Sequence, residues 1–386
     1  MRSGAGNSAG RTLAVLHPAF ALTGVIQAVG GPLLPSLASS FHLNDNESGL
    51  MFLLYFAGTS LGALFCRGNY ARAMALGFMG MTVCCLGIAV AGRSLLAPLF
   101  LLLGISAGVP MSAINLFAGR NFPERCAPIL TFLNFSWSAG ALAAPLLAAR
   151  VLAHHSYRAA YVVLAVPAAA AALACWLMIE DAPEAARAHR ATDGFTNLRF
   201  IIVFALAAFL QVGMENTAAT WLSTYALRMA GSGFVLAAAA SSLYWLGFLG
   251  TRGFSSLLLL RVRPAQVFRV AVAVALAAAL LLAGVPGLAG GAIAMFLLGA
   301  ALAPIYPLII AGALARGRRT SDARWVLATA GFGGSVLPWI AGWISSQTGS
   351  LRVGLLILPA ALLLMALVLP SLDGPRQAAA EEPAGS

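Results

Sequence analysis

Long apolar segments separated by short polar breaks recur along the whole chain. A membrane-crossing helix needs about 20 consecutive apolar residues, and this length identifies twelve candidate spans. They cover approximately residues 13–36, 48–66, 74–92, 95–118, 128–150, 159–179, 200–226, 233–251, 267–285, 290–314, 325–346 and 352–370. Pro within several of them is acceptable, because neighbouring helices can satisfy the freed backbone groups. The pattern predicts an all-α membrane protein with twelve transmembrane helices.

The polar breaks predict an orientation, because basic residues gather in cytoplasmic loops. All 23 basic residues are Arg. With both termini in the cytoplasm, 18 of them lie in inner segments, and the five outer ones are Arg93, Arg150, Arg158, Arg228 and Arg352. An odd number of spans would break this alternation. We therefore expect a multi-pass protein of a bacterial inner membrane with both termini cytoplasmic.

Composition narrows the possible functions. Only 9% of the residues are charged, against about 25% in a typical soluble protein. The five Cys form neither a C-x-x-C motif nor a cluster with His, so a metal site and a disulfide framework lack support. A phosphate-binding G-x-x-x-x-G-K motif is also missing, which disfavours an ATP-driven pump. We expect no cofactor and no metal. We also expect no nucleic-acid partner, despite the net charge of +11. The protein is predicted to be a monomer in the lipid bilayer.

The chain reads as two halves. The longest internal hydrophilic stretch, 180–199, leaves six spans on each side. Two short strings also repeat: FAGT at 56–59 resembles FLGT at 248–251, and LLG recurs at 102–104 and 297–299. Their offsets of 192 and 195 residues, about half the chain, indicate a duplicated six-helix unit. We predict an N-terminal bundle (1–179), a cytoplasmic linker (180–199) and a C-terminal bundle (200–386) that ends in a short disordered tail.

Glu215 is the exceptional acidic residue. The chain has 12 acidic side chains, and the other eleven lie in or beside hydrophilic breaks. Glu215 lies 15 residues beyond Phe200, or about 22 Å along a helix, which is close to the middle of the membrane. A carboxylate at that depth marks a functional site by default. The alternatives are a structural ion pair with Arg228 or a hydrogen bond between helices.

Amides and aromatic residues accompany this acid. The intramembrane amides are Gln27, Asn115, Asn134, Gln211 and Asn216. An amide both donates and accepts hydrogen bonds, which suits a neutral polyhydroxylated ligand; the alternative is hydrogen bonding between helices, about 0.6 kcal/mol each. Trp137, Tyr244 and Tyr306 lie in spans near these polar residues. Their rings could stack on sugar C–H faces, or could simply pack. We predict that these residues and Glu215 line a substrate site.

Three short motifs carry a family resemblance. They are GPLLP at 31–35, NFSWSAG at 134–140, and VGMEN at 212–216 followed by Trp221. With twelve spans and a 6+6 division, the chain resembles the fucose/glucose/galactose–proton symporter branch of the major facilitator superfamily. The resemblance implies two pseudo-symmetric six-helix bundles that bind a solute between them and open to each side in turn.

Two departures from the family pattern bear on mechanism. The loop between spans 2 and 3, within 62–72, lacks the acid that the superfamily usually has there. The carboxylates that this branch is expected to carry in spans 1 and 4 are replaced by Gln27 and Asn115. Glu215 is therefore the remaining candidate for proton coupling.

Four basic residues are candidates for gating. Arg67 and Arg72 follow span 2, and Arg252 and Arg261 follow span 8, the repeat-related position. We hypothesise that they bond helix C-terminal carbonyls or acids when the inner side is closed. The alternative is that they only signal the cytoplasmic side.

Together these features predict a secondary active or facilitative transporter for a small neutral polar solute, a sugar or polyol. The alternatives are a proton-driven exporter of a drug or hydroxylated metabolite and, in another class, an intramembrane enzyme or a non-transporting receptor. An enzyme is disfavoured because no Ser/His or His/Asp set lies at membrane depth. The residues do not distinguish import from export, or uniport from coupling to a proton or a sodium ion.

Overall fold

The computed structural model describes residues 2–65, 69–122, 126–179, 198–230, 233–258, 261–284, 287–316 and 320–372, and these ranges contain helices and no strand. The first six helices are α1 (Arg2–Phe41), α2 (Asp45–Leu64), α3 (Tyr70–Val90), α4 (Arg93–Asn121), α5 (Cys126–Leu152) and α6 (Tyr157–Met178). The remaining helices are α7 (Leu198–Ala230), α8 (Phe234–Leu258), α9 (Pro264–Gly284), α10 (Leu288–Leu302), α11 (Ile305–Arg316), α12 (Thr320–Thr348), α13 (Leu351–Gly354) and α14 (Ile357–Leu372).

These helices form the twelve predicted spans. Eleven described segments are long and apolar enough to cross a membrane, and α12 completes the set. Two predicted spans are interrupted: α10 and α11 are separated at Ala303 and Pro304, and α13 and α14 share the last span. A Pro lacks the N–H that would continue the helix, which accounts for the break before α11. The predicted linker lies almost wholly outside the described residues.

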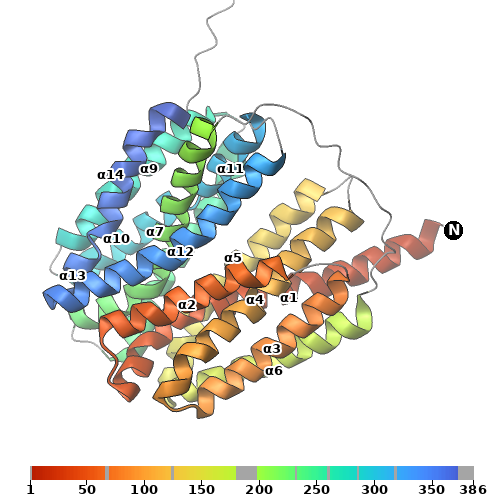
Figure 1. Ribbon diagram of the computed structural model, residues 1–386, viewed down its shortest axis with the longest axis horizontal. Coiled ribbons are helices and arrows are strands. Elements are labelled where there is room, and N and C mark those ends of the chain that lie inside the picture. The colour runs from red at the N-terminus through yellow and green to blue at the C-terminus, as the bar shows by residue number, and fades with distance from the viewer. Residues whose placement is uncertain are drawn as a thin grey trace, which may run out of the picture.

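The helices form two bundles, α1–α6 and α7–α14 (Figure 1). In the first, α1 packs on α5, α2 on α4, and α3 on α6. In the second, α7 packs on α12, and α10 packs on both α8 and α9. Four pairs join the bundles: α2 with α12, α5 with α8, α1 with α7 and, to a smaller extent, α1 with α8. The walls of a site between the bundles therefore come mainly from these six helices.

The turn from α1 to α2 has a well-defined geometry. Asn44 caps α2: its side chain accepts from the backbone N–H of Glu47 at 2.8 Å, and the Glu47 carboxylate accepts from the Asn44 N–H at 3.0 Å. This reciprocal pair is a capping box, and it satisfies two backbone donors that the helix start leaves unpaired. The cap fixes the direction in which Asp45, the first residue of α2, points.

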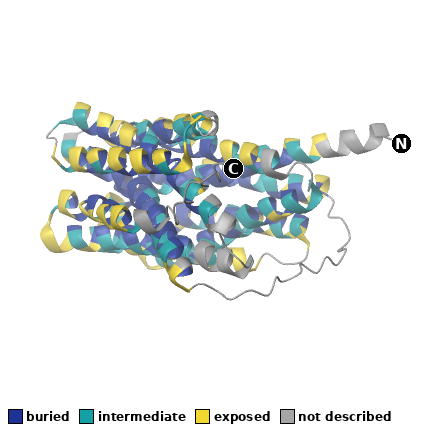
Figure 2. Ribbon diagram, turned by 90° about the horizontal axis from the view of Figure 1, so that it is seen from above, coloured by how far each residue is buried: buried dark blue, intermediate teal, exposed yellow. Residues whose placement is uncertain are grey.

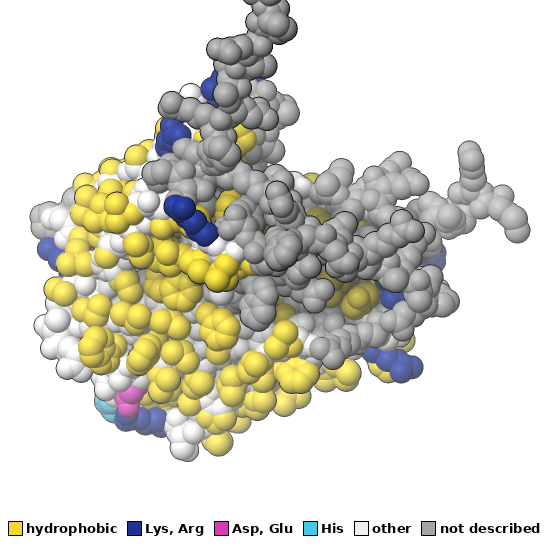
Figure 3. All heavy atoms as spheres, turned by 45° about the horizontal axis from the view of Figure 1, so that its top comes forward, with side chains coloured by type: hydrophobic (Ala, Val, Ile, Leu, Met, Phe, Trp, Pro, Cys, Tyr) yellow, Lys and Arg dark blue, Asp and Glu magenta, His cyan; other side chains and the backbone are white. Residues whose placement is uncertain are grey.

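The buried residues lie between the helices (Figure 2), and many large hydrophobic side chains lie on the outward faces. Large hydrophobic side chains such as Leu76, Val90 and Val166 are each at least two-thirds exposed. The space-filling view shows a broad field of hydrophobic side chains with basic ones at its margins (Figure 3). Such a surface is costly in water but suits the acyl chains of a membrane.

Candidate functional site

Glu215 lies near the middle of α7 and is half-buried between the bundles. Among the described residues its carboxylate has neither a hydrogen bond nor an ion pair. The cation that acts on it electrostatically is Arg252 of α8. Arg228, the alternative partner suggested by the sequence, instead pairs with Asp45. The acid at the membrane centre therefore keeps its hydrogen-bonding capacity.

Arg252 joins the two bundles. It lies six residues before the end of α8 and is half-buried. Its Nη1 donates to the Ser138 hydroxyl of α5 at 3.1 Å, and its guanidinium lies 4.6 Å from the centroid of the Phe248 ring. The ring supports the cation through its quadrupole. A guanidinium has five N–H donors, and within the described chain only the bond to Ser138 uses one.

Tyrosines and tryptophans surround this pair of charges. The Tyr244 and Tyr306 hydroxyls lie within electrostatic range of both Glu215 and Arg252. Trp137 of α5 packs edge-on against Trp245 of α8, with ring centroids 5.9 Å apart. Trp245 in turn packs against Tyr244 at 5.1 Å. A row of aromatic rings thus leads from Trp137 of the first bundle to Tyr244, which interacts with the two charges.

Two buried polar atoms in this cluster have no partner among the described residues: the Tyr244 hydroxyl and the Trp137 indole Nε1. Most buried polar groups in folded proteins are hydrogen-bonded, and an orphan calls for a specific reason. A bound polar molecule would supply the missing bonds. An anion, a cation, an unpaired hydroxyl and an unpaired N–H can together hold a ligand that both donates and accepts.

The predicted amides are placed differently. The Asn115 and Asn134 side chains each donate to the carbonyl four residues earlier, at 2.8 Å. Gln211 is fully buried and donates to the Leu302 carbonyl at 2.8 Å, while its Oε1 lacks a described partner. Asn216 is buried against Gly334 of α12, and Gln27 is half-buried on α1. The described contacts bring Glu215, Tyr244 and Tyr306 together around Arg252, but they do not connect Gln27 or Asn115 to this cluster.

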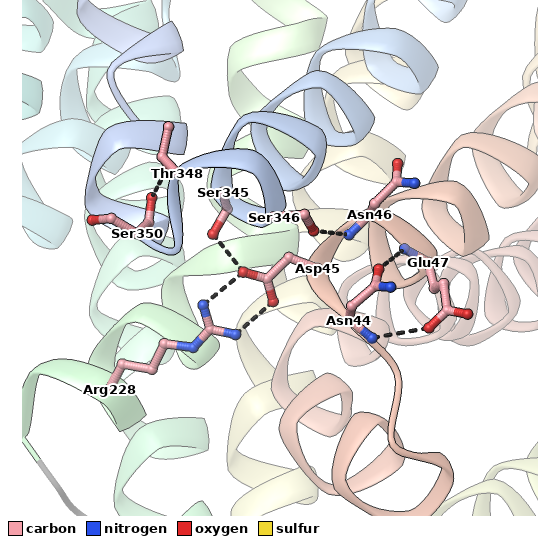
Figure 4. A network of polar contacts seen from close by, with 9 residues as sticks. All are labelled: Asn44, Asp45, Asn46, Glu47, Arg228, Ser345, Ser346, Thr348 and Ser350. Carbon is pink, nitrogen blue, oxygen red and sulfur yellow. Dashed lines mark hydrogen bonds and ion pairs between the residues drawn. The ribbon is translucent and has the colours of Figure 1, made fainter.

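A second polar network lies at the end of the bundles where α2 begins (Figure 4). Asp45 of α2 accepts two hydrogen bonds from the guanidinium of Arg228 on α7, at 2.7 and 2.5 Å. The hydroxyl of Ser345 on α12 donates to the same carboxylate. This bidentate geometry is the strong form of an Arg–carboxylate pair.

Asn46 extends this network. Its backbone N–H donates to Ser346 at 2.7 Å, and its side-chain oxygen accepts from the indole of Trp339 at 3.0 Å. A Cβ at Gly342 would collide with the Asp45 carbonyl oxygen, so glycine allows α12 to approach. We call Asp45, Asn46, Arg228, Trp339, Ser345 and Ser346 the clasp. It fastens the first bundle to the second at one end.

The gating candidates do not lie together. Arg67 is outside the described residues. Arg72 is exposed in the first turn of α3, where its backbone N–H donates to the Asn69 side chain. Arg261 is exposed between α8 and α9, whereas Arg252 lies inside the interface.

The sequence analysis missed Ser138 and, apart from Arg228, the residues of the clasp, of which Asp45 is the charged one. Asp45 sits in a hydrophilic break, which concealed it among the solvated acids. Ser138 lies in the NFSWSAG motif, which was the one available signal.

Two six-helix bundles that enclose a polar cluster define a membrane transporter fold. The chain belongs to the Major Facilitator Superfamily, whose model matches residues 16–323. This family membership confirms the predicted superfamily and identifies the protein as a transporter, and not an enzyme.

Solved structures support the same fold. A bacterial homologue of the human lysosomal transporter Spinster, inward-facing and occupied, has a TM-score of 0.73 at 14% identity, covering 94% of this chain and 95% of that one. The nucleoside transporter NupG (D323A mutant) has a TM-score of 0.78 at 13% identity, with 94% and 99% covered. FucP in the outward conformation has a TM-score of 0.65 at 19% identity, with 94% and 98% covered. A comparison with curated proteins found no match.

Proposed function

We propose that the protein moves a small neutral polar solute, a sugar or polyol, across the membrane by alternating access. The observation that carries the proposal is that Glu215 of α7 and Arg252 of α8 act on each other electrostatically without forming an ion pair. Their formal charges cancel, so an uncharged solute enters without leaving a net buried charge. An ionic solute would need a further counter-charge to offset its desolvation.

The proposed binding mode uses the unused donors and acceptors. Solute hydroxyls donate to Glu215 and accept from the remaining N–H groups of Arg252. Tyr244 and Trp137 contribute their unpartnered O–H and N–H, and their rings face the C–H groups. Gln27, Asn115 and Asn134 complete the wall from the first bundle, and Gln211, Asn216 and Tyr306 complete it from the second.

The proposed orientation places both termini in the cytoplasm of a bacterium, following the Arg distribution. The clasp then lies on the outer side and holds that side closed. Alternating access requires the Asp45–Arg228 pair to separate when the outer side opens. Arg67, Arg72 and Arg261, nearer the inner surface, contact the other bundle when the inner side closes, and Arg252 keeps its bond to Ser138 closer to the site. The transporter acts as a monomer.

Flux into proteoliposomes tests this proposal. Purified protein should exchange a labelled sugar or polyol from a panel of neutral solutes, with charged solutes of similar size as the matched set. Saturable exchange confined to neutral solutes supports the proposal. Binding without flux would make the protein a receptor, and flux confined to ions would reject the neutral-solute class.

The Glu215→Gln variant tests the coupling role in the same vesicles. A carboxyl that takes up and releases a proton during the cycle would couple proton and solute movement. In that case the variant loses accumulation driven by a pH gradient but retains exchange between equal solute pools. If Glu215 only binds solute, exchange and accumulation fall together. Wild-type uptake that ignores an imposed pH gradient would reject proton coupling and leave sodium coupling or uniport.

A further inference from the structure

An open groove lies on the surface of the second bundle, and none of the residues of the polar cluster line it. Its volume is about 270 Å³, and its lining is almost wholly apolar. Thr251 and Leu258 of α8, Val262, Val270 of α9, Ala300 of α10 and Pro304 contribute to its walls.

The groove forms where the close contact between α8 and α10 ends. A Cβ at Gly299 would collide with the Tyr244 carbonyl oxygen, so the two helices touch at that level. The groove walls begin beyond this contact, at Thr251 of α8 and Ala300 of α10. α10 ends at Leu302, just before Pro304, and residues of α9 form the remaining wall.

The mouth of the groove faces outward. Val270 and Val274 of α9 line it and are 62% and 37% exposed. They belong to a helix that is long and apolar enough to span the membrane. The medium around such a face is the acyl chains of the bilayer, and a flexible chain suits an apolar groove of this shape.

One end of the groove carries positive charge. Val262, which lines the groove, lies between Arg261 and Arg263, and both are exposed. Neither Arg has an ion-pair partner among the described residues. The sequence from 216 to 321, which includes α8, α9 and α10, contains no Asp or Glu. The turn that holds these Arg residues connects two membrane spans, which places it at the level of lipid head groups.

We propose that this groove binds an anionic phospholipid, with one acyl chain between α8, α9 and α10 and the phosphate on Arg261 and Arg263. A guanidinium matches phosphate oxygens in a bidentate geometry, and basic pockets between membrane helices bind acidic head groups. Uncompensated positive charge at the end of an apolar groove selects an acidic lipid over a zwitterionic one. The proposal is independent of the solute that is transported.

Lipid retention by the full-length protein tests this proposal. The protein is reconstituted into nanodiscs of phosphatidylcholine alone or with phosphatidylglycerol, extracted into mild detergent, and analysed for retained lipid by native mass spectrometry. Wild type should retain phosphatidylglycerol preferentially. In the Arg261→Gln/Arg263→Gln double variant, the ratio of retained phosphatidylglycerol to phosphatidylcholine should fall about fivefold for each Arg removed. The matched control, Arg150→Gln/Arg158→Gln, removes two exposed Arg of the first bundle and should retain the preference.

A groove-filling variant, Ala300→Leu, tests the contribution of the acyl chain to lipid binding separately from that of the head group. It should reduce the retention of both lipids while leaving Arg261 and Arg263 in place. Equal retention of the two lipids by wild type, or an unchanged preference in the double Arg variant, would overturn the proposal. A preference for phosphatidylglycerol that weakens when inorganic phosphate is added would show that the head group rests on the Arg pair, and would support the proposal. If Ala300→Leu does not fold, the double Arg variant and its control decide the question.

Discussion

In the first bundle, Asn115 and Asn134 donate to carbonyls of their own helices, whereas in the second bundle Glu215, Arg252 and Tyr244 keep unused bonding capacity. Asp45 of the first bundle forms an ion pair with Arg228 of the second, and this pair lies at the end of the interface and not at its centre. The first bundle therefore uses charge to fasten the bundles together, and the second uses charge where a solute would bind.

This difference assigns separate tasks to the two halves of a duplicated fold. In the first bundle the two amides bond to their own backbone, and among its predicted site residues only Trp137 has an unpartnered buried polar atom within the described chain. A half with unsatisfied polar groups gains most from a ligand, because the ligand supplies bonds that the protein lacks. We therefore expect that substitutions in the second bundle mainly change binding and transport. A substitution at Asp45 should mainly change the balance between conformations.

The largest effect is expected at Arg252. Arg252→Gln leaves Glu215 without a compensating charge, and it removes the contact with Ser138 of the first bundle. We expect transport to fall at least tenfold, and the free energy of unfolding to fall by about 1–3 kcal/mol, because the half-buried Glu215 is left without a compensating charge. Flux assays and thermal unfolding of the same preparation measure the two effects.

The double variant Glu215→Gln/Arg252→Gln tests whether the two charges act as a pair. If they do, it should be more stable than the sum of the single variants predicts, by about 1 kcal/mol. Strict additivity would show that the two charges are independent, and would weaken the contrast between the bundles.

The next effect is expected at the clasp. Asp45→Asn removes the ion pair with Arg228 and weakens the bond from Ser345. For a partly exposed ion pair we expect the closed form to lose about 1 kcal/mol of stability relative to the open form. This loss shifts the ratio of closed to open forms about fivefold. Spin labels on Cys at positions 42 and 347, placed in a variant without the native Cys, report the separation of the bundles at this end.

The matched control is Glu47→Gln. It breaks the ion pair with Arg93 inside the first bundle while retaining an oxygen for the α2 cap. Its distance distribution should match that of wild type. A shift of equal size in both variants would mean that the clasp does not hold the bundles together.

Much of the fold could be predicted because a span requires a fixed length of apolar sequence. The interruption at Pro304 could not, because Pro inside an apolar run is compatible with a continuous helix. Glu215 stood out as a lone acid in an apolar segment. The sequence predicts Arg252 as a gating residue or as a marker of the cytoplasmic side, and only the packing of α5 on α8 shows that it reaches Ser138.

The clasp shows a different limit of sequence reasoning. Asp45 and Arg228 are 183 residues apart and each lies next to a polar break. Positive-inside counting uses Arg228 only as a topology signal and takes no account of Asp45. Their pairing depends on how α2 meets α7 and α12, which the pattern of one chain does not specify.

Smaller effects are expected at the amides of the first bundle. Since the Asn115 NH₂ group is bonded to the Met111 carbonyl, mainly its oxygen remains for a solute. Asn115→Leu should therefore weaken binding by about 0.5–1.5 kcal/mol, or roughly 2- to 13-fold. Asn121→Leu is the control, because Asn121 makes the same kind of bond at the end of α4. If both variants bind solute as tightly as wild type does, the first bundle contributes no amide to the site.

The smallest and sharpest test compares two tyrosines of the second bundle. The Tyr225 hydroxyl donates to the Leu282 carbonyl at 2.7 Å, whereas the equally buried Tyr244 hydroxyl has no partner among the described residues. Tyr225→Phe should cost about 1 kcal/mol of stability and leave solute affinity unchanged. Tyr244→Phe removes an unsatisfied group, so stability should hold or rise, while affinity falls because the solute loses one hydrogen bond. Unfolding in the absence of solute and binding titrations separate the two quantities. If Tyr244→Phe instead lowers stability and leaves affinity intact, its hydroxyl is structural and the site does not extend to Tyr244.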